Sequence, residues 1–373
     1  MSEQVENGED ADVHNIESLE KAQAHADDTN ETPPSDIVAY NELRSCADIF
    51  RMHDEGSLEI QPEFQRDFIW KPIDQTRFID SLVKQLPIPS MCFAYDHKQN
   101  TWIVIDGLQR ISTIIRFLGG QDWKLANLPD IDPHLSGANA KDIKAGKANL
   151  KQFYSRVQNQ TLPINVLRCD FKKKQHNEYL FTIFHRLNSG GSKLNNQEIR
   201  NCIYSGSLNN LLKELDSNPK WMNINRMKPG VRYRFIKQEW ILRLFAFLES
   251  ADKYKGFVSS FLNDYMFAHR NEADAPLQAR RDLFDRVVSI LADKIFAGEP
   301  EPPRMPGTVL EAMMIGIASN LEHLEHSTDT HVRSLYNKMR VHESISDASL
   351  AEGLSKPDKV AARFDASRAI FAE

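Results

Sequence analysis

The segment 103–116 constrains the fold of this chain more than any other. It reads I-V-I-D-G-L-Q-R-I-S-T-I-I-R, an apolar run followed by a polar turn and an amphipathic stretch. The apolar, β-branched run predicts a buried strand over Trp102–Ile105. Asp106 and Gly107 end that strand, because glycine allows a sharp turn. Apolar residues at helical spacing then predict a helix over 108–118.

The turn between this strand and helix has the features of an anion-binding site. The first N–H groups of a helix have no intrahelical partner, so an anion can dock there. Gln109 and Arg110 fall in the first turn, where an arginine opposes the helix dipole unless an anion such as phosphate lies between them. The alternative is a plain β-α turn, in which Asp106 caps the helix and Arg110 pairs with a carboxylate. For an isolated turn of this kind the alternative is favoured.

The charge of the chain is unevenly distributed. Residues 1–36 hold 11 Asp and Glu, a single Lys and no aromatic residue, which predicts a disordered acidic tail. The other residues carry 45 Lys and Arg against 41 Asp and Glu, a mildly basic balance that permits a nucleic-acid partner. Four widely spaced cysteines, an acidic N-terminus and the lack of an apolar run of ~18 residues indicate a cytoplasmic protein without a membrane span.

Periodicity along the chain predicts an α+β protein, with an α/β part over 37–207 and an all-helical part over 208–373. In the first part we expect a short helix over 37–51, an extended segment over 58–66, helices over 74–86 and 177–187, and strands over 91–95, 102–106 and 162–169. We expect 121–160 to be irregular, with one helical piece over 142–154. Asn195 and Glu198 form a capping box before a further helix.

In the second part, helical spacing predicts six helices, over 235–248, 257–268, 276–296, 308–324, 331–341 and 356–371. Thr308 and Glu311 have the spacing of a capping box at the start of the fourth.

Four polar clusters in the α/β part lie where sites on such scaffolds tend to occur. They are Gln65-Arg66, Asp106–Arg110, Asn188 with Gly190-Gly191, and Glu198 with Arg200. The first reads I-x-P-x-F-Q-R-x-F-x-W and precedes a helix ending in L-P-I-P. The second reads I-D-G-x-Q-R-I-S-T-I. The third and fourth together read F-x-R-L-N-x-G-G-x-x-L-x-x-Q-E-I-R.

In this order and spacing, the four motifs resemble the N-terminal domain of GmrSD-type modification-dependent restriction systems, which has a ParB/sulfiredoxin-like fold. The similarity covers roughly residues 40–210. The resemblance implies binding of a nucleoside triphosphate with Mg²⁺, without a Walker loop, and nucleotide turnover coupled to sensing modified DNA.

The resemblance also implies which residues carry this chemistry. Asp106, Gly107, Gln109 and Arg110 would line the phosphate or metal end of the nucleotide site, with Asp106, Gln109 and Arg110 as the catalytic candidates. Arg66 is the candidate second phosphate contact, and Asn188 and Arg200 are further candidates.

The chain departs from the family pattern at Leu108, where the family usually has Gln. A leucine cannot position a water molecule or contact a phosphate, so hydrolysis is in doubt more than binding. The turn also lacks the Cys of sulfiredoxins, which argues against their redox chemistry. No histidine after residue 250 begins an H-x-x-P pattern, so we expect no HNH nuclease in this chain, or a cryptic one. Pro129-Asp130 and Asp142-Ile143-Lys144 imitate a nuclease signature in a stretch without strand pattern.

The best candidate for DNA contact is the segment R-M-K-P-G-V-R-Y-R-F-I-K. It contains five basic residues and no acid: Arg226, Lys228, Arg232, Arg234 and Lys237. Clustered cations suit phosphates, and the interleaved Tyr233 and Phe235 suit stacking on bases. An ordinary solvated loop, with both aromatic rings turned into the core, has equal weight.

These observations lead to one main hypothesis and two alternatives. The main one is a nucleoside-triphosphate-binding, and hydrolysing, protein of a DNA-directed restriction or phage-defence system, whose nucleotide changes its grip on DNA or on a separate nuclease subunit. The alternatives are a non-enzymatic ParB-like DNA-binding module and a stand-alone modification-dependent endonuclease. The oligomeric state stays open, a homo-oligomer included.

Overall fold

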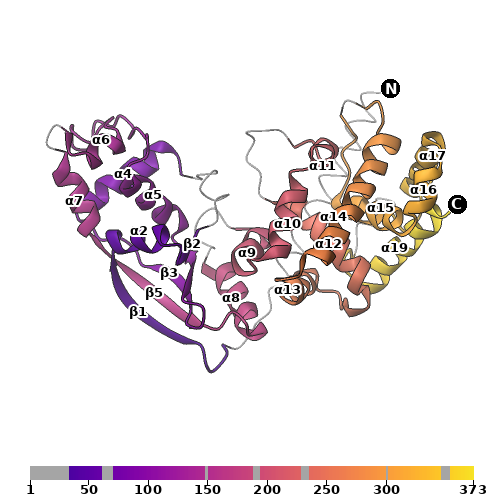
Figure 1. The fold of residues 1–373 in the computed structure, drawn as a ribbon, viewed down its shortest axis with the longest axis horizontal. Helices are drawn as coiled ribbons and strands as arrows, with labels where there is room; N and C mark the ends of the chain where they lie inside the picture. The colour runs from indigo at the N-terminus through magenta and orange to yellow at the C-terminus, as the bar shows by residue number, and fades with distance from the viewer. Residues whose placement is uncertain are drawn as a thin grey trace. The chain divides into compact units, whose positions relative to one another are not determined.

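The computed structural model describes residues 33–60, 70–147, 150–187, 194–227, 235–299, 301–345 and 353–373 (Figure 1). The described residues divide into a compact unit ending at Leu194 and a second compact unit that begins at Asn195. The first unit contains the sheet, and the second is helical. This division falls before the helix that starts at Asn196, whereas the sequence placed that helix in the α/β part.

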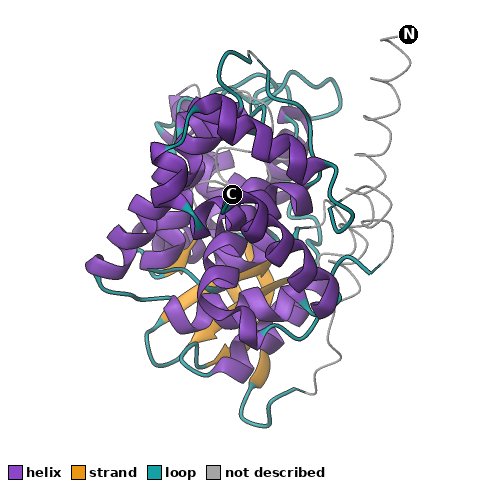
Figure 2. Ribbon diagram, turned by 90° about the vertical axis from the view of Figure 1, so that its right-hand side faces the viewer, coloured by secondary structure: helices purple, strands orange, loops and turns teal. Residues whose placement is uncertain are grey.

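The sheet of the first unit has five strands in the order β1-β5-β3-β4-β2. Its strands are the orange segments in Figure 2. The strands are β1 (Val38–Ser45), β2 (Leu58–Glu59), β3 (Met91–Asp96), β4 (Thr101–Asp106) and β5 (Thr161–Cys169). β3 pairs with β4 as an antiparallel hairpin and with β5 in parallel. The strands predicted over 91–95, 102–106 and 162–169 are thus confirmed, and the mixed α+β class with them.

The helix predicted over 37–51 is wrong in its first half. Val38–Ser45 is an edge strand that pairs antiparallel with β5 along its whole length. The helix α2 (Cys46–Asp54) begins only where the Ser45 side chain accepts a hydrogen bond from the backbone N–H of Asp48. Most β1 side chains are exposed, so the strand shows little of the burial pattern from which strands are predicted.

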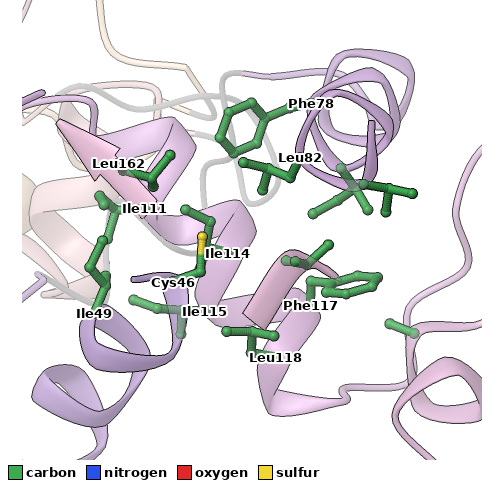
Figure 3. Close-up of a cluster of buried hydrophobic side chains, with 14 of the residues drawn as sticks. Cys46, Ile49, Phe78, Leu82, Ile111, Ile114, Ile115, Phe117, Leu118 and Leu162 are labelled. Atoms are coloured by element: carbon green, nitrogen blue, oxygen red, sulfur yellow. The ribbon is translucent and has the colours of Figure 1, made fainter. Parts of the chain in front are cut away.

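One face of the sheet is covered by helices that share a single hydrophobic core. These include α2, α4 (Pro72–Val83), α5 (Leu108–Gly119), α6 (Ala140–Lys144) and α7 (Lys151–Asn159). Figure 3 shows the apolar face of α5, including Ile111, Ile114 and Leu118, meeting side chains of α2 and α4. α8 (Lys174–Leu187) contacts β4. Because α5 is central to this core, the turn that precedes it is firmly held.

The segment 121–160 is more ordered than we expected. It contains two helices, α6 and α7, in place of the single helical piece predicted over 142–154. Buried side chains such as Trp123, Leu125 and Leu128 attach the loop before α6 to the core. Their spacing is irregular, so no helical or strand period marks them in the sequence.

The second unit is helical throughout its described residues. Its helices are α9 (Asn196–Ile203), α10 (Ser207–Asp216), α11 (Pro219–Ile224), α12 (Ile236–Ser250), α13 (Val258–His269), α14 (Asp274–Ser289), α15 (Gly307–Ser319), α16 (Leu321–His326), α17 (Asp329–Arg340) and α19 (Pro357–Phe371), with a 3₁₀ turn η3 (Ala251–Lys253) and a π-helical turn η4 (Ile290–Ile295). The predicted Asn195/Glu198 capping box is present.

The capping box predicted for Thr308 and Glu311 is wrong. α15 starts one residue earlier, with Pro306 at the N-cap and no side-chain cap. Both side chains are buried instead. In the part of the chain that the structure describes, no helix combines the length and apolar character needed to cross a membrane.

Candidate functional site

The turn between β4 and α5 is tightly constrained by its glycine. Gly107 has φ of 95°, in the left-handed region that favours glycine. A Cβ at this position would lie 2.5 Å from Cγ of Met91, so a side chain has no room. Gly107 is also the N-cap of α5 and provides no side-chain cap, and Asp106 does not take that role. The first N–H groups of α5 are therefore left for another acceptor.

Arg110 links three parts of this turn. Its Nη2 forms an ion pair with Oδ2 of Asp106 at 2.8 Å. Its Nη1 donates to the carbonyl oxygen of Pro89 at 2.5 Å, and Nη2 lies 3.4 Å from the carbonyl oxygen of Ser90. The guanidinium thus joins the end of β4 to the segment before β3. The second half of the plain-turn alternative, an arginine paired with a carboxylate, is what the structure shows.

The environment of this ion pair leaves one carboxylate oxygen open. The Arg110 side chain is only 15% exposed, and its burial lowers the pKa of the guanidinium against the opposing effect of Asp106. The Asp106 side chain is 36% exposed. Among the described residues, Oδ1 of Asp106 has no hydrogen-bond partner. A half-exposed carboxylate oxygen beside uncapped N–H groups suits a cation and a phosphate together.

Gln109 connects the turn to the end of the first polar cluster. Its Oε1 accepts a hydrogen bond from the backbone N–H of Trp70 at 3.3 Å. Trp70 in turn packs edge-on against Phe78 of α4. Arg66, the candidate second phosphate contact, lies outside the described residues, as does Gln65. The structure therefore brings the chain just after the first cluster to the turn.

Leu108 has a packing role that explains its apolar character. Its side chain is partly buried and packs against the hydrophobic core of the α/β unit. It adds no polar group to the turn.

Arg200 lies in the helical unit and is completely buried. Its guanidinium donates to Asn263 Oδ1 at 2.9 Å, to Gln197 Oε1 at 3.2 Å and to Glu239 Oε2 at 2.8 Å. These contacts join α9 to α12 and α13 inside the helical unit. The ion pair with Glu239 balances the charge of Arg200 inside the unit. A contact of Arg200 with a nucleotide stays a prediction. Asn188 lies outside the described residues.

The candidate DNA-contact segment is described only at its two ends. Lys228, Arg232 and Arg234 lie outside the described residues. Arg226 and Lys237 both line one cavity of about 300 Å³ in the helical unit. The two ends of the segment are therefore close in space.

The residues that imitate a nuclease signature are engaged in ordinary surface pairs. Asp130 pairs with Arg77 at 2.7 Å, and Asp142 pairs with Lys147 at 2.7 Å. Asp142 and Lys144 lie on α6, not on a strand. Within the described ranges, no group of three or more His, Cys, Asp or Glu side chains is placed to hold a metal ion.

The four cysteines are all buried and free of disulfide bonds. Burial raises the pKa of Cys46, Cys92 and Cys169 to about 12. Thiols of this kind remain protonated and are poor nucleophiles near neutral pH.

The sequence did not indicate the backbone carbonyls of Pro89 and Ser90 as partners of Arg110. The L-P-I-P segment that ends at Pro89 was noted only as a helix end. Its two prolines predict an extended backbone, but the side chain that its carbonyl groups meet depends on tertiary packing.

The comparisons with known proteins agree with the motifs. Residues 46–205 match the family model described as GmrSD restriction endonuclease, N-terminal domain. A search of the curated proteins gives no match, and neither does a search of solved structures. The matched region contains the Asp106–Arg110 turn and the Arg200 motif. The family points to a component of a DNA-directed restriction or defence system. Residues 46–205 of this chain are a GmrSD-type restriction endonuclease N-terminal domain.

Proposed function

We propose that this chain binds a nucleoside triphosphate at the turn between β4 and α5, and that the bound nucleotide controls how the protein engages DNA or a separate nuclease subunit. The observation that carries the proposal is the Arg110–Asp106 pair at the uncapped start of α5. A charge pair beside free helical N–H groups provides contacts for both a phosphate and its counter-cation.

The residues of the turn fit both groups. The N–H groups at the start of α5 suit phosphate oxygens, and Gly107 leaves the approach free of a side chain. Oδ1 of Asp106 is the kind of hard oxygen ligand that Mg²⁺ prefers. When bound, Mg²⁺ neutralises charge on the phosphates. To contact a phosphate, Arg110 must give up one of its hydrogen bonds to the carbonyl oxygens of Pro89 and Ser90. Gln109 orients the turn through Trp70.

Hydrolysis is the less supported half of the proposal. Leu108 faces the core and offers no group to orient a water molecule. Gln109, which has the required polar side chain, already accepts a hydrogen bond from Trp70 through Oε1. Turnover in this chain would therefore depend on Asp106, Gln109 and Arg110 together.

The DNA-directed part of the proposal follows from the family and from the charge of the chain. Outside the acidic residues 1–36 the chain carries a small positive excess. The function also predicts a cytoplasmic protein, where DNA and nucleoside triphosphates are both present.

The test is phosphate release from each of the four ribonucleoside triphosphates with Mg²⁺, with and without DNA, by the wild type and by Arg110→Ala. Release that Arg110→Ala abolishes establishes an NTPase, and stimulation by DNA ties turnover to DNA sensing. Binding is followed in parallel by the rise in unfolding temperature with each nucleotide.

A matched control separates loss of the site from loss of the fold. Arg77→Ala removes an arginine of the same unit whose ion pair with Asp130 is about half exposed. This variant should bind nucleotide as the wild type does. Nucleotide affinity that is unchanged in a folded Arg110→Ala protein would overturn the proposal.

Leu108 favours a second candidate function, a non-enzymatic DNA-binding module. In this case one nucleotide raises the unfolding temperature in an Arg110-dependent manner, but no phosphate is released. Leu108→Gln restores the residue that the family usually has at this position. Phosphate release by this variant would show that Leu108 is the cause of the lost hydrolysis, and no release would show that hydrolysis does not depend on this position.

A further inference from the structure

The helical unit contains a basic cavity. It has a volume of about 300 Å³. Three cationic side chains line it, from three separate segments: Arg226 after α11, Lys237 in the first turn of α12, and Arg304 in the segment before α15. Among the residues that the structure describes, its lining contains no acidic side chain.

A second cavity in the same unit shows that this charge pattern is not a general property of the surface. That cavity, of about 370 Å³, is lined by three acidic and two cationic side chains: Asp285, Asp293, Glu325, Arg286 and Lys294. Its charges compensate one another through the ion pair of Arg286 with Glu325. In the basic cavity the acidic partner of Arg226 is Glu301, which lies 3.8 Å away and is not among the described lining residues.

Arg304 is the cation best placed to receive a ligand. It is exposed, and among the described residues it forms no ion pair. Arg226 is held more firmly, because its Nε donates to the carbonyl oxygen of Pro302 at 2.6 Å, while Nη1 lies 3.8 Å from Oε2 of the exposed Glu301. Arg226 therefore has a fixed position at the cavity, and Arg304 is available.

Two helix N-termini add to the positive potential. α12 begins after Phe235 and α15 after Pro306, and neither has a side-chain cap. Lys237 in the first turn of α12 and Leu310 in the first turn of α15 both line the cavity, so the start of each helix lies at it. The positive end of a helix dipole favours an anion.

Apart from Asn225, the other described residues of the cavity lining are apolar. Ile224, Pro303, Met305 and Leu310 contribute carbon and sulfur surface beside the cations. A small inorganic anion makes no favourable contact with such an apolar surface. The planar ring of a base packs against it, and a methionine sulfur makes favourable contacts with aromatic rings.

We propose that this cavity binds a single nucleotide unit, with the phosphate on Arg304, Arg226 and Lys237 and the base against Met305 and its apolar neighbours. The unit is either a free mononucleotide or an unpaired nucleotide of a DNA strand. This proposal does not depend on nucleotide binding at Arg110. It rests on the proposed DNA-directed function only where it names a DNA strand as a source of the nucleotide.

The experiment is calorimetric titration of the full chain with inorganic phosphate, deoxynucleoside 5′-monophosphates, a short single-stranded oligonucleotide and a blunt duplex. The variants are Arg304→Ala, Met305→Ala and, as a matched control, Arg368→Ala. Arg368 lies on α19, where it pairs with Asp365 at 3.2 Å. Because Arg304 is exposed, its replacement should leave the fold intact, which the unfolding temperature checks.

We expect Arg304→Ala to weaken binding of the monophosphate or the single strand on the order of tenfold, the effect of one charge-assisted contact. Met305→Ala should weaken the same ligands without affecting inorganic phosphate. Arg368→Ala should leave these affinities unchanged. Binding of the monophosphate alone identifies a free nucleotide as the ligand, and binding of the single strand identifies DNA.

Two results would overturn the inference. One is equal affinity of wild type and Arg304→Ala for both the monophosphate and the single strand. The other is an Arg304 effect confined to the duplex, which would make Arg304 a surface contact of the DNA backbone. Failure of the proposed NTP site is recognised separately, because it concerns Arg110→Ala and triphosphates.

Discussion

The Oε1 atom of Gln109 accepts a hydrogen bond from the backbone N–H of Trp70, 3.3 Å away, across 39 positions of sequence. The bond fastens the chain that follows the first polar cluster to the first turn of α5. Gln109, which the sequence suggested as a ligand contact, thus also holds the backbone at Trp70. Experiments can separate this structural role from ligand binding.

Gln109→Ala should loosen the chain around Trp70. The lost hydrogen bond is worth about 0.5–1.5 kcal/mol, so exchange of the Trp70 amide hydrogen should become roughly two- to tenfold faster. Gln109→Glu retains an acceptor and should preserve the protection. Hydrogen exchange read by mass spectrometry on a peptide containing Trp70 measures this, and equal exchange in wild type and Gln109→Ala would contradict it.

Gly107→Ala should destabilise the α/β unit through two separate effects. The left-handed φ costs about 1–2 kcal/mol for an alanine, and the contact of its Cβ with Met91 adds overpacking strain of about 1–3 kcal/mol. Only the second effect depends on Met91. In a double-mutant cycle measured by urea unfolding, Gly107→Ala should therefore cost less in a Met91→Ala background than in the wild type. Identical costs in the two backgrounds would show that the contact is relieved by a backbone shift.

Glu239 should make the helical unit sensitive to acid. Burial alone would raise its pKa, but the charges of Arg243 and Arg200 outweigh this and lower the pKa to about 2. Since the folded-state pKa lies below the unfolded value of about 4.5, the stabilisation is complete above pH 4.5 and is lost as the pH falls toward 2. Free energies of unfolding measured across this range should decline in the wild type.

Glu239→Gln should remove that part of the acid sensitivity together with the carboxylate that Arg200 and Arg243 share, while Arg243 keeps Glu311 at 3.6 Å. Breaking a buried ion pair of this kind costs about 3–5 kcal/mol near neutral pH. Arg200→Met, which replaces the buried cation by an apolar chain, tests the pair from the other side. A Glu239→Gln protein with wild-type stability at pH 7 and the wild-type decline below pH 4.5 would show that Glu239 is not the group responsible.

Asp130→Asn and Asp142→Asn should leave both stability and any DNA cleavage unchanged. Each carboxylate is in an exposed ion pair, and such pairs contribute about 0–1 kcal/mol. The measurement is Mg²⁺-dependent nicking of modified plasmid by each variant. Nicking by the wild type that either substitution abolishes would instead support a stand-alone endonuclease.

The local part of the fold was predictable because its signals are local. The β4–turn–α5 unit follows from a run of apolar residues, one glycine and helical spacing, all within 103–119. β1 was missed because its partner β5 lies more than a hundred residues away, and an exposed edge strand has no hydrophobic alternation. The Ser45 cap, with Asp48 three residues on, was the available indication that the helix starts at Cys46.

The candidate site was predictable in its residues more than in its contacts. Asp106 and Arg110 are four residues apart across the turn, so their pairing is within reach of sequence reasoning. The carbonyl groups of Pro89 and Ser90 depend on tertiary packing and are not. Arg200 shows a second limit of sequence reasoning. A cluster of polar residues suggests a ligand site, but the Arg200 guanidinium bonds to Asn263 and Glu239 inside the helical unit, and the sequence does not distinguish the two cases.

The edge position of β1 has a practical consequence for dissecting this protein. An expressed fragment cut to the family match, residues 46–205, would start after β1 and would leave the backbone of β5 unpaired on that side. It would also carry α9 without α12 and α13, so that the Arg200 side chain, now enclosed, would meet water or a neighbouring molecule. Such a fragment should self-associate through its open strand, and solubility would return only when the sequence from Val38 is restored and the cut is moved to the end of α8.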